Sequence, residues 1–67
     1  MKRAAALAAV TRAFEERLAR MCIMLGDGFE SSGRDKANAK QHFADGLAML
    51  ADAEAFAVAT VTAAFED

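Results

Sequence analysis

The residues that interrupt helices are confined to one short part of this chain. The sequence has no proline, and its four glycines all lie between Gly26 and Gly46. Three of them fall within residues 26–33, where the conformational freedom of glycine favours turns over a continuing helix. The pattern therefore predicts two long helices, at about residues 3–25 and 34–65, joined by a glycine-rich loop. Ser32 followed by Asp35 fits a loose capping box, which places the start of the second helix near Gly33 or Arg34.

The size and composition describe one small globular domain, residues 1–67, that needs help to be stable. Of the 67 residues, 55% are hydrophobic and 27% are charged. A core of this size contributes little unless disulfides, a metal or a partner chain support it. Cys22 is the single cysteine and His42 the single histidine, too few for an internal disulfide or a four-ligand zinc site. Association with another chain is therefore expected, and the odd cysteine favours a reducing, cytoplasmic location.

The spacing of apolar residues predicts an antiparallel hairpin with more apolar surface than one partner helix can cover. A heptad-like seam runs along the first helix through Ala4, Leu7, Thr11, Phe14, Leu18, Met21 and Leu25. Within the chain, Leu7, Phe14, Leu18 and Met21 are expected to face Phe43, Leu47, Leu50, Ala57 and Val61. The predicted contacts to a partner chain are Met49, Ala53, Phe56 and Thr60. The expected fold is all-α, a hairpin completed by a second chain as the four-helix bundle of a homodimer.

Charge is divided unevenly between the two predicted helices. Residues 1–25 carry five bases and two acids, whereas residues 41–67 carry five acids and no base. An antiparallel hairpin brings Lys2 and Arg3 beside Glu66 and Asp67, so the two ends of the chain should attract each other. Nucleic-acid binding is not expected, because the net charge is −2 and acids interrupt the bases of the first helix.

No constellation of residues predicts catalysis, and the chain is expected not to be an enzyme. His42 has one carboxylate in helical register, Asp45, and Cys22 lies on the other helix, so neither a nucleophile–base pair nor a metal or cofactor site is expected. Glu54 is the polar residue in the middle of the apolar face of the second predicted helix, between Leu50 and Val58. It could bond to Thr11, meet an arginine of another chain, or extend to water at an open edge.

Membrane insertion and export are not expected either. The apolar run that ends at Val10 spans only seven residues after Arg3 before charged residues follow, which is too short for a signal peptide. No stretch approaches the roughly 18 to 20 apolar residues that a membrane span requires.

Two segments of the sequence resemble a known family. Ala39-Lys40-Gln41-His42-Phe43, followed by Glu54-Ala55-Phe56-Ala57-Val58, is similar to the small type III secretion needle co-chaperones. The resemblance implies a cytoplasmic helical hairpin that binds a chaperone and keeps a needle subunit from polymerising. In architecture alone, the chain is also similar to small homodimeric helical-hairpin regulators and to phage-encoded inhibitors. Both resemblances imply a non-enzymatic role in protein association, with a host protein or RNA as the target of the alternative regulator.

Overall fold

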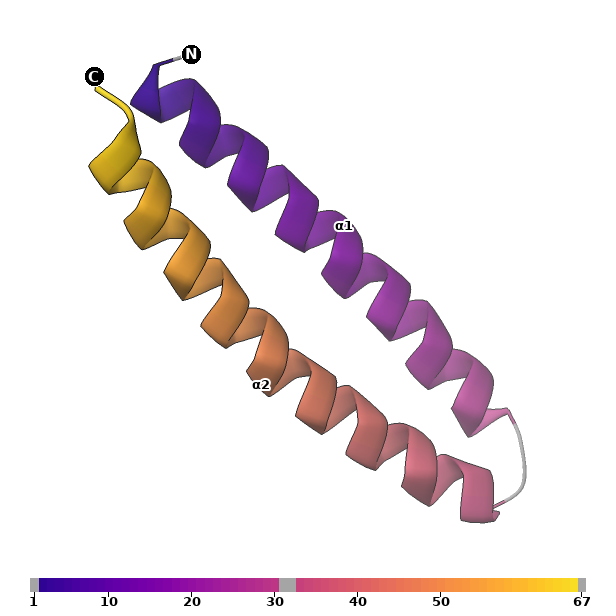
Figure 1. Cartoon of the computed structure of the whole chain (residues 1–67). Helices are drawn as coiled ribbons and strands as arrows, with labels where there is room; N and C mark the ends of the chain where they lie inside the picture. Colours follow the sequence, from indigo (N-terminus) through magenta and orange to yellow (C-terminus); the bar gives the residue numbers. More distant parts are fainter. Residues whose placement is uncertain (1, 31–32, 67) are drawn as a thin grey trace.

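Two antiparallel helices make up almost all of the chain. The computed structural model describes residues 2–30 and 33–66, with side chains left out for 33–35, and contains α1 (Arg3–Phe29) and α2 (Gly33–Ala64). Figure 1 shows the two helices lying side by side, with both termini at one end and the connection at the other. The all-helical hairpin is thus confirmed, and α2 has the bounds expected to within one residue.

The first helix is longer than predicted and passes through two glycines. We expected an end near residue 25, but α1 continues through Gly26 and Gly28, neither of which has a positive φ. Its last turn contacts α2, since the ammonium groups of Lys36 and Lys40 lie 5.1 and 5.6 Å from the centre of the Phe29 ring. Cation–π contacts of this kind offset part of the roughly 1 kcal/mol that each helical glycine costs relative to alanine. The predicted capping residue Ser32 lies outside the described residues.

Arg3 joins the two helices by hydrogen bonds at the end of the hairpin where the termini lie. Its backbone N–H donates to the carbonyl oxygen of Glu66 at 2.8 Å, and its Nε donates to the carbonyl oxygen of Phe65 at 3.0 Å. A cation at the C-terminal end of a helix satisfies carbonyls that have no partner within the helix and complements the helix dipole. The two ends were expected to attract each other through their charged side chains. In the structure Arg3 binds the main-chain carbonyls of Phe65 and Glu66. Asp67 lies outside the described residues.

The contact positions of the second helix repeat every eleven residues. The half-buried residues of α2, with Phe65 directly after its last residue, form three series with this spacing: Ala39, Leu50 and Val61; Phe43, Glu54 and Phe65; Gly46 and Ala57. In α1 the half-buried residues Leu7, Phe14, Met21 and Gly28 are spaced by seven, while Val10 and Met21, and Phe14 and Leu25, are eleven residues apart. The eleven-residue repeat of α2 corresponds to about 3.67 residues per turn, close to that of a straight helix.

The heptad-like seam predicted for the first helix is wrong at Ala4 and Thr11, whereas Leu7, Phe14, Met21 and Leu25 are half-buried as predicted. Ala4 and Thr11 are exposed, and their places at the contact are taken by Ala6 and Val10. Between Leu7 and Phe14 a step of three residues selects Val10 and a step of four selects Thr11, and the structure has the step of three. Leu18 and Leu47 lie at the edge of the seam, at 37% and 41% exposure.

The hairpin has almost no core of its own. Of the described residues only Ala6 is buried, at 5% exposure. The chain exposes 5088 Å², against about 4,100 Å² expected for a compact protein of 7.1 kDa. Its radius of gyration is 15.4 Å, whereas about 11 Å is typical of a compact domain of this length. The surfaces of α1 and α2 are therefore mostly open.

Candidate functional site

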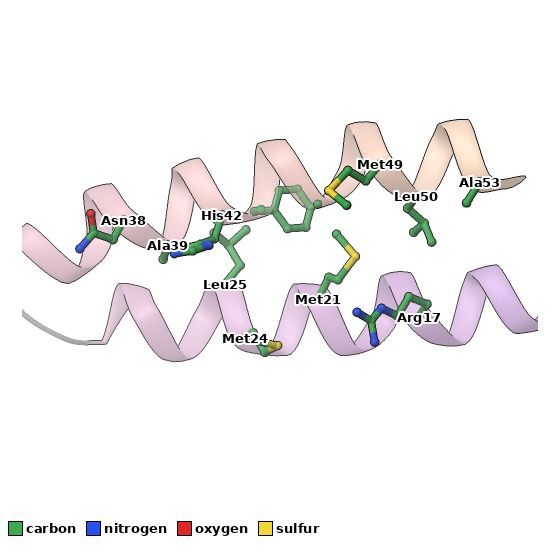
Figure 2. Close-up of a pocket in the computed structure, with 12 residues that line it drawn as sticks. Arg17, Met21, Met24, Leu25, Asn38, Ala39, His42, Met49, Leu50 and Ala53 are labelled. Atoms are coloured by element: carbon green, nitrogen blue, oxygen red, sulfur yellow. The ribbon is translucent and has the colours of Figure 1, made fainter.

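An open groove runs along one side of the hairpin, in the half nearer the connection. Its volume is about 690 Å³ and both helices line it. We call it the methionine groove, and its lining residues are Arg17, Met21, Met24, Leu25, Asn38, Ala39, His42, Phe43, Gly46, Met49, Leu50 and Ala53. Figure 2 shows Met21 and Leu25 extending from α1 toward α2, with Met49 and Leu50 on the facing helix. The groove is predominantly apolar, with Arg17, Asn38 and His42 as its polar members.

Gly46 shapes the floor of the methionine groove. A Cβ atom at this position would lie 3.0 Å from Cε of Met21, closer than ordinary van der Waals contact. The nearest neighbour of this position on α1 is therefore a side chain. The glycine thus leaves a notch in α2 that the end of Met21 occupies.

The most exposed large apolar side chains lie on the same side as the methionine groove. Met24, Met49 and Phe56 are 70%, 72% and 74% exposed. Met49, Ala53, Phe56 and Thr60 follow one face of α2 because they are spaced by four, three and four residues. The hydroxyl of Thr60 donates to the Phe56 carbonyl at 2.8 Å, so it is satisfied within the helix. We call the methionine groove, together with Phe56 and Thr60, the open face.

The opposite side of the hairpin carries a smaller hollow with two carboxylates. Its volume is about 150 Å³, and it is lined by Phe14, Glu15, Leu18, Leu47, Leu50, Ala51 and Glu54. Glu54 is half-buried among these apolar side chains. The hypothesis of a bond from Thr11 to Glu54 is wrong, because Thr11 is exposed and no hydrogen bond of the described residues joins the two.

Replacing Glu54 with leucine is expected to stabilise the hairpin. The new side chain would extend the apolar contacts of Leu18 and Leu47 and remove a half-buried carboxylate. We expect a gain of about 1 kcal/mol in the free energy of unfolding, which raises Tm by about 4–8 °C in a domain of this size. Thermal unfolding followed by circular dichroism measures this. Glu15→Leu, at an exposed position beside the same hollow, is the matched control and should change stability by less than about 0.5 kcal/mol. A lower Tm for Glu54→Leu would mean that the carboxylate has a partner, such as an arginine of another chain.

The predicted interface residues divide into two groups in the structure. At the seam, half-buried, are Leu7, Phe14, Met21, Phe43, Leu50, Glu54 and Val61. Exposed are Leu18, Leu47, Met49, Ala53, Phe56 and Thr60. The prediction missed Met24 and Arg17, which line the methionine groove from α1. Their spacing from Met21, three residues after and four before, was the signal that could have found them.

The residues considered for chemistry lie apart from one another. His42 is exposed and lines the methionine groove, while Cys22 is an exposed free thiol on α1. The carboxylate of Asp45 accepts a hydrogen bond from Nε2 of Gln41 at 2.9 Å. Within the described part of the chain, no three His, Cys, Asp or Glu side chains group closely enough to hold a metal ion.

The expectation that no stretch approaches a membrane span does not hold for the second helix. By length and composition, the segment Lys36–Ala64 could cross a membrane, with a mean hydropathy of 1.5 over its best 18-residue window. Alanine makes up much of this window, which is why large apolar residues alone did not reveal it. A core helix of a globular assembly passes the same test, but here none of the window is buried within the hairpin. Something outside the chain must cover this helix if its apolar surface is to leave water.

Comparisons with known proteins add no relative. No family model matches the chain, and no curated protein or solved structure matches it either. The similarity to needle co-chaperones therefore stays a prediction, and function is inferred here from the surface of the hairpin.

Proposed function

We propose that this chain is a non-enzymatic protein–protein interaction module whose open face is covered by another polypeptide. One observation carries the proposal: Met24, Met49 and Phe56 are each at least 70% exposed on one side of a hairpin in which, among described residues, only Ala6 is buried. Large apolar side chains gathered on one side of a small protein mark interaction surfaces. Methionine suits such a surface because its flexible side chain adapts to the shape of a partner.

The energetics of the isolated hairpin favour the same proposal. Ordering a residue costs about 1.5 kcal/mol of backbone and side-chain entropy, which burial of apolar surface must offset. The chain exposes about a quarter more surface than a compact protein of its mass. A partner that covers the open face would supply the burial that the hairpin lacks.

Two kinds of role fit a module of this type. A co-chaperone or adaptor of the cytoplasm would use the open face directly on its client. The alternative is a small regulator or inhibitor that homodimerises and then binds a host protein or RNA through its outer surface. Exposed Arg12 on α1 is the observation that favours this second role.

A lipid bilayer is the competing way to cover α2, and its charges argue against it. Asp45, Asp52 and Glu54 lie in the middle of Lys36–Ala64, and an acid near the centre of a span costs about 2.5–3.5 kcal/mol. A polypeptide partner can leave the exposed Asp45 and Asp52 in water at the edge of the interface. We therefore propose a protein partner.

The test is the solution mass and helicity of the purified chain over a dilution series without detergent. We expect a mass above 7.1 kDa by light scattering, and a helical signal in circular dichroism that falls together with the mass on dilution. A weakly helical monomer at all concentrations would point to a different protein as the partner. A stable monomer, with helicity and Tm independent of concentration, would contradict the proposal. Sedimentation with lipid vesicles, expected to leave the protein in the supernatant, tests the membrane alternative.

A further inference from the structure

We infer that the partner on the open face is a second copy of this chain, docked so that both interhelical connections lie at the same end. In this arrangement α1 of each copy packs against α2 of the other. The inference rests on the proposed function and adds to it the identity and the direction of the partner. Surface area, charge and side-chain size each contribute to it.

The surface area of the hairpin matches what a stable homodimer needs. Two separate chains expose twice 5088 Å², about 10,200 Å². A compact protein of twice the mass exposes about 6,800 Å², so a dimer of ordinary compactness would bury about 3,400 Å². Obligate homodimers bury about 2,000–5,000 Å². One additional copy is therefore enough to cover the excess.

The choice of face follows from the distribution of carboxylates. The smaller hollow on the opposite side is lined by Glu15 and Glu54, which a two-fold contact would bring together with their copies. The methionine groove has no carboxylate among its lining residues. A second copy can therefore cover the open face without burying acids against each other.

Two contacts within the hairpin fix which residues lie at the same level. Arg3 is bonded to Glu66, and Met21 meets the notch at Gly46. Each residue of α1 therefore lies at the same height along the hairpin as one residue of α2. The numbers of two residues at the same height add up to about 68. Arg17 is level with residue 51 and Arg20 with residue 48, to within about one turn.

Charge selects the direction of docking. When the connections lie at the same end, α1 of one copy faces α2 of the other. Residues at the same height within one hairpin are then also at the same height across the two copies. Arg17 then lies within a turn of Asp52 of the second copy, and Arg20 within a turn of Asp45. All four side chains are exposed in the hairpin. These contacts occur twice in a symmetric dimer, and complementary charges across an interface set orientation more than affinity.

Docking with the connections at opposite ends brings like charges together. In that arrangement α1 lies against α1 and α2 against α2. Residues 1–25 carry a net +3, from five bases and two acids, and residues 41–67 carry five acids and no base. The part of α2 that carries Asp45 and Asp52 and no base, residues 41–64, would then face its own copy, which costs affinity.

Side-chain size agrees with the same-end arrangement. Phe56 is level with residue 12 of α1, between Ala9 and Ala13. Both alanines are exposed and lie on the side of α1 that carries Arg20 and Met24, at spacings of seven and eleven residues from Ala13. The ring of Phe56 would therefore enter a gap between small side chains of the second copy.

Distances between spin labels test the arrangement on the full chain. In a Cys22→Ser background, a label at Glu30→Cys reports the separation of the two connections. Same-end docking predicts a separation below about 30 Å, given interaxial distances of 8–10 Å and the label linkers. Opposite-end docking predicts a separation near the 50 Å length of the hairpin. A label at Glu16→Cys, close to the middle, is the matched control, because its separation should be short in either dimer.

A charge-exchange experiment tests the predicted pair directly. Arg20→Asp alone and Asp45→Arg alone should each raise the dimer dissociation constant about tenfold, because each places like charges at two sites of the dimer. The double variant should return to within about threefold of wild type. The two residues lie on the outer edges of different helices, so restoration within one chain is not expected.

The outcomes separate this inference from the proposed function. A dimer with a short Glu30 separation and restoration in the double variant supports the inference. A dimer with a separation near 50 Å overturns the same-end docking but leaves the proposed function intact. A weakly helical monomer overturns the second copy as partner and leaves a different protein. A stable helical monomer overturns both.

Discussion

The Phe56→Asp chain is expected to behave as a 7.1 kDa monomer at concentrations where the wild type is an assembly. Phe56 is 74% exposed in the hairpin, so the substitution removes little from the fold of the single chain. In the assembly the ring would be covered, and burial of such a side chain contributes about 1.5–3 kcal/mol. A symmetric dimer contains two copies of it, and the new carboxylate would have to be desolvated as well.

The expected size of this effect is a loss of at least about 3–6 kcal/mol per dimer. That loss raises the dissociation constant by a factor of roughly a hundred or more. Light scattering after size exclusion, at several loading concentrations, measures it. Ala48→Asp is the matched control, since it places the same charge at an exposed position of α2 that faces away from the seam.

The control also defines what would contradict the assignment of the open face. If Phe56→Asp keeps the mass of the wild type while Ala48→Asp lowers it, the interface lies on the outer side of α2. If both variants keep the wild-type mass, neither surface is covered in the assembly. Helicity of Phe56→Asp should decrease but persist at low temperature, because Leu50 and Phe43 still pack at the seam.

The general fold could be predicted because the helix-interrupting residues lie in one place. The end of α1 could not, because local propensity and tertiary contact disagree there. Gly26 and Gly28 favour a turn, yet the helix continues past them and its last residue, Phe29, contacts Lys36 and Lys40. A contact between residues on different helices is not visible in the local sequence.

The seam illustrates a second limit, which concerns periodicity. A seven-residue repeat allows two orders of its three- and four-residue steps. Between Leu7 and Phe14 one order selects Thr11 and the other selects Val10, and the spacing of apolar residues does not distinguish them. The prediction for the exposed side of α2 depended less on the assumed spacing. Met49 and Phe56 were predicted to contact a partner chain because the hairpin has more apolar surface than one helix can cover. The methionine groove itself was missed because it depends on how Met21 fills the notch at Gly46.

Leu50→Asp is expected to abolish the cooperative unfolding transition of the hairpin. Leu50 is half-buried at the centre of the seam and lines both the methionine groove and the smaller hollow. The substitution removes an apolar side chain whose burial contributes about 1.5–3 kcal/mol, and it introduces a carboxylate beside Phe14 and Phe43. Because only Ala6 is buried among the described residues, little other core remains to offset this loss.

Circular dichroism should therefore show less than about half of the wild-type helical signal for Leu50→Asp, with a gradual thermal change in place of a transition. Leu50→Met, which nearly conserves the volume, is the control and should keep the transition at a cost below about 1.5 kcal/mol. A Leu50→Asp chain that unfolds cooperatively at the wild-type Tm would show that the seam does not hold the helices together. Phe56→Asp should dissociate to a monomer that keeps part of its helical signal. Leu50→Asp should lose the assembly and the helical signal together. That difference separates the surface that binds a second chain from the contact that forms the hairpin.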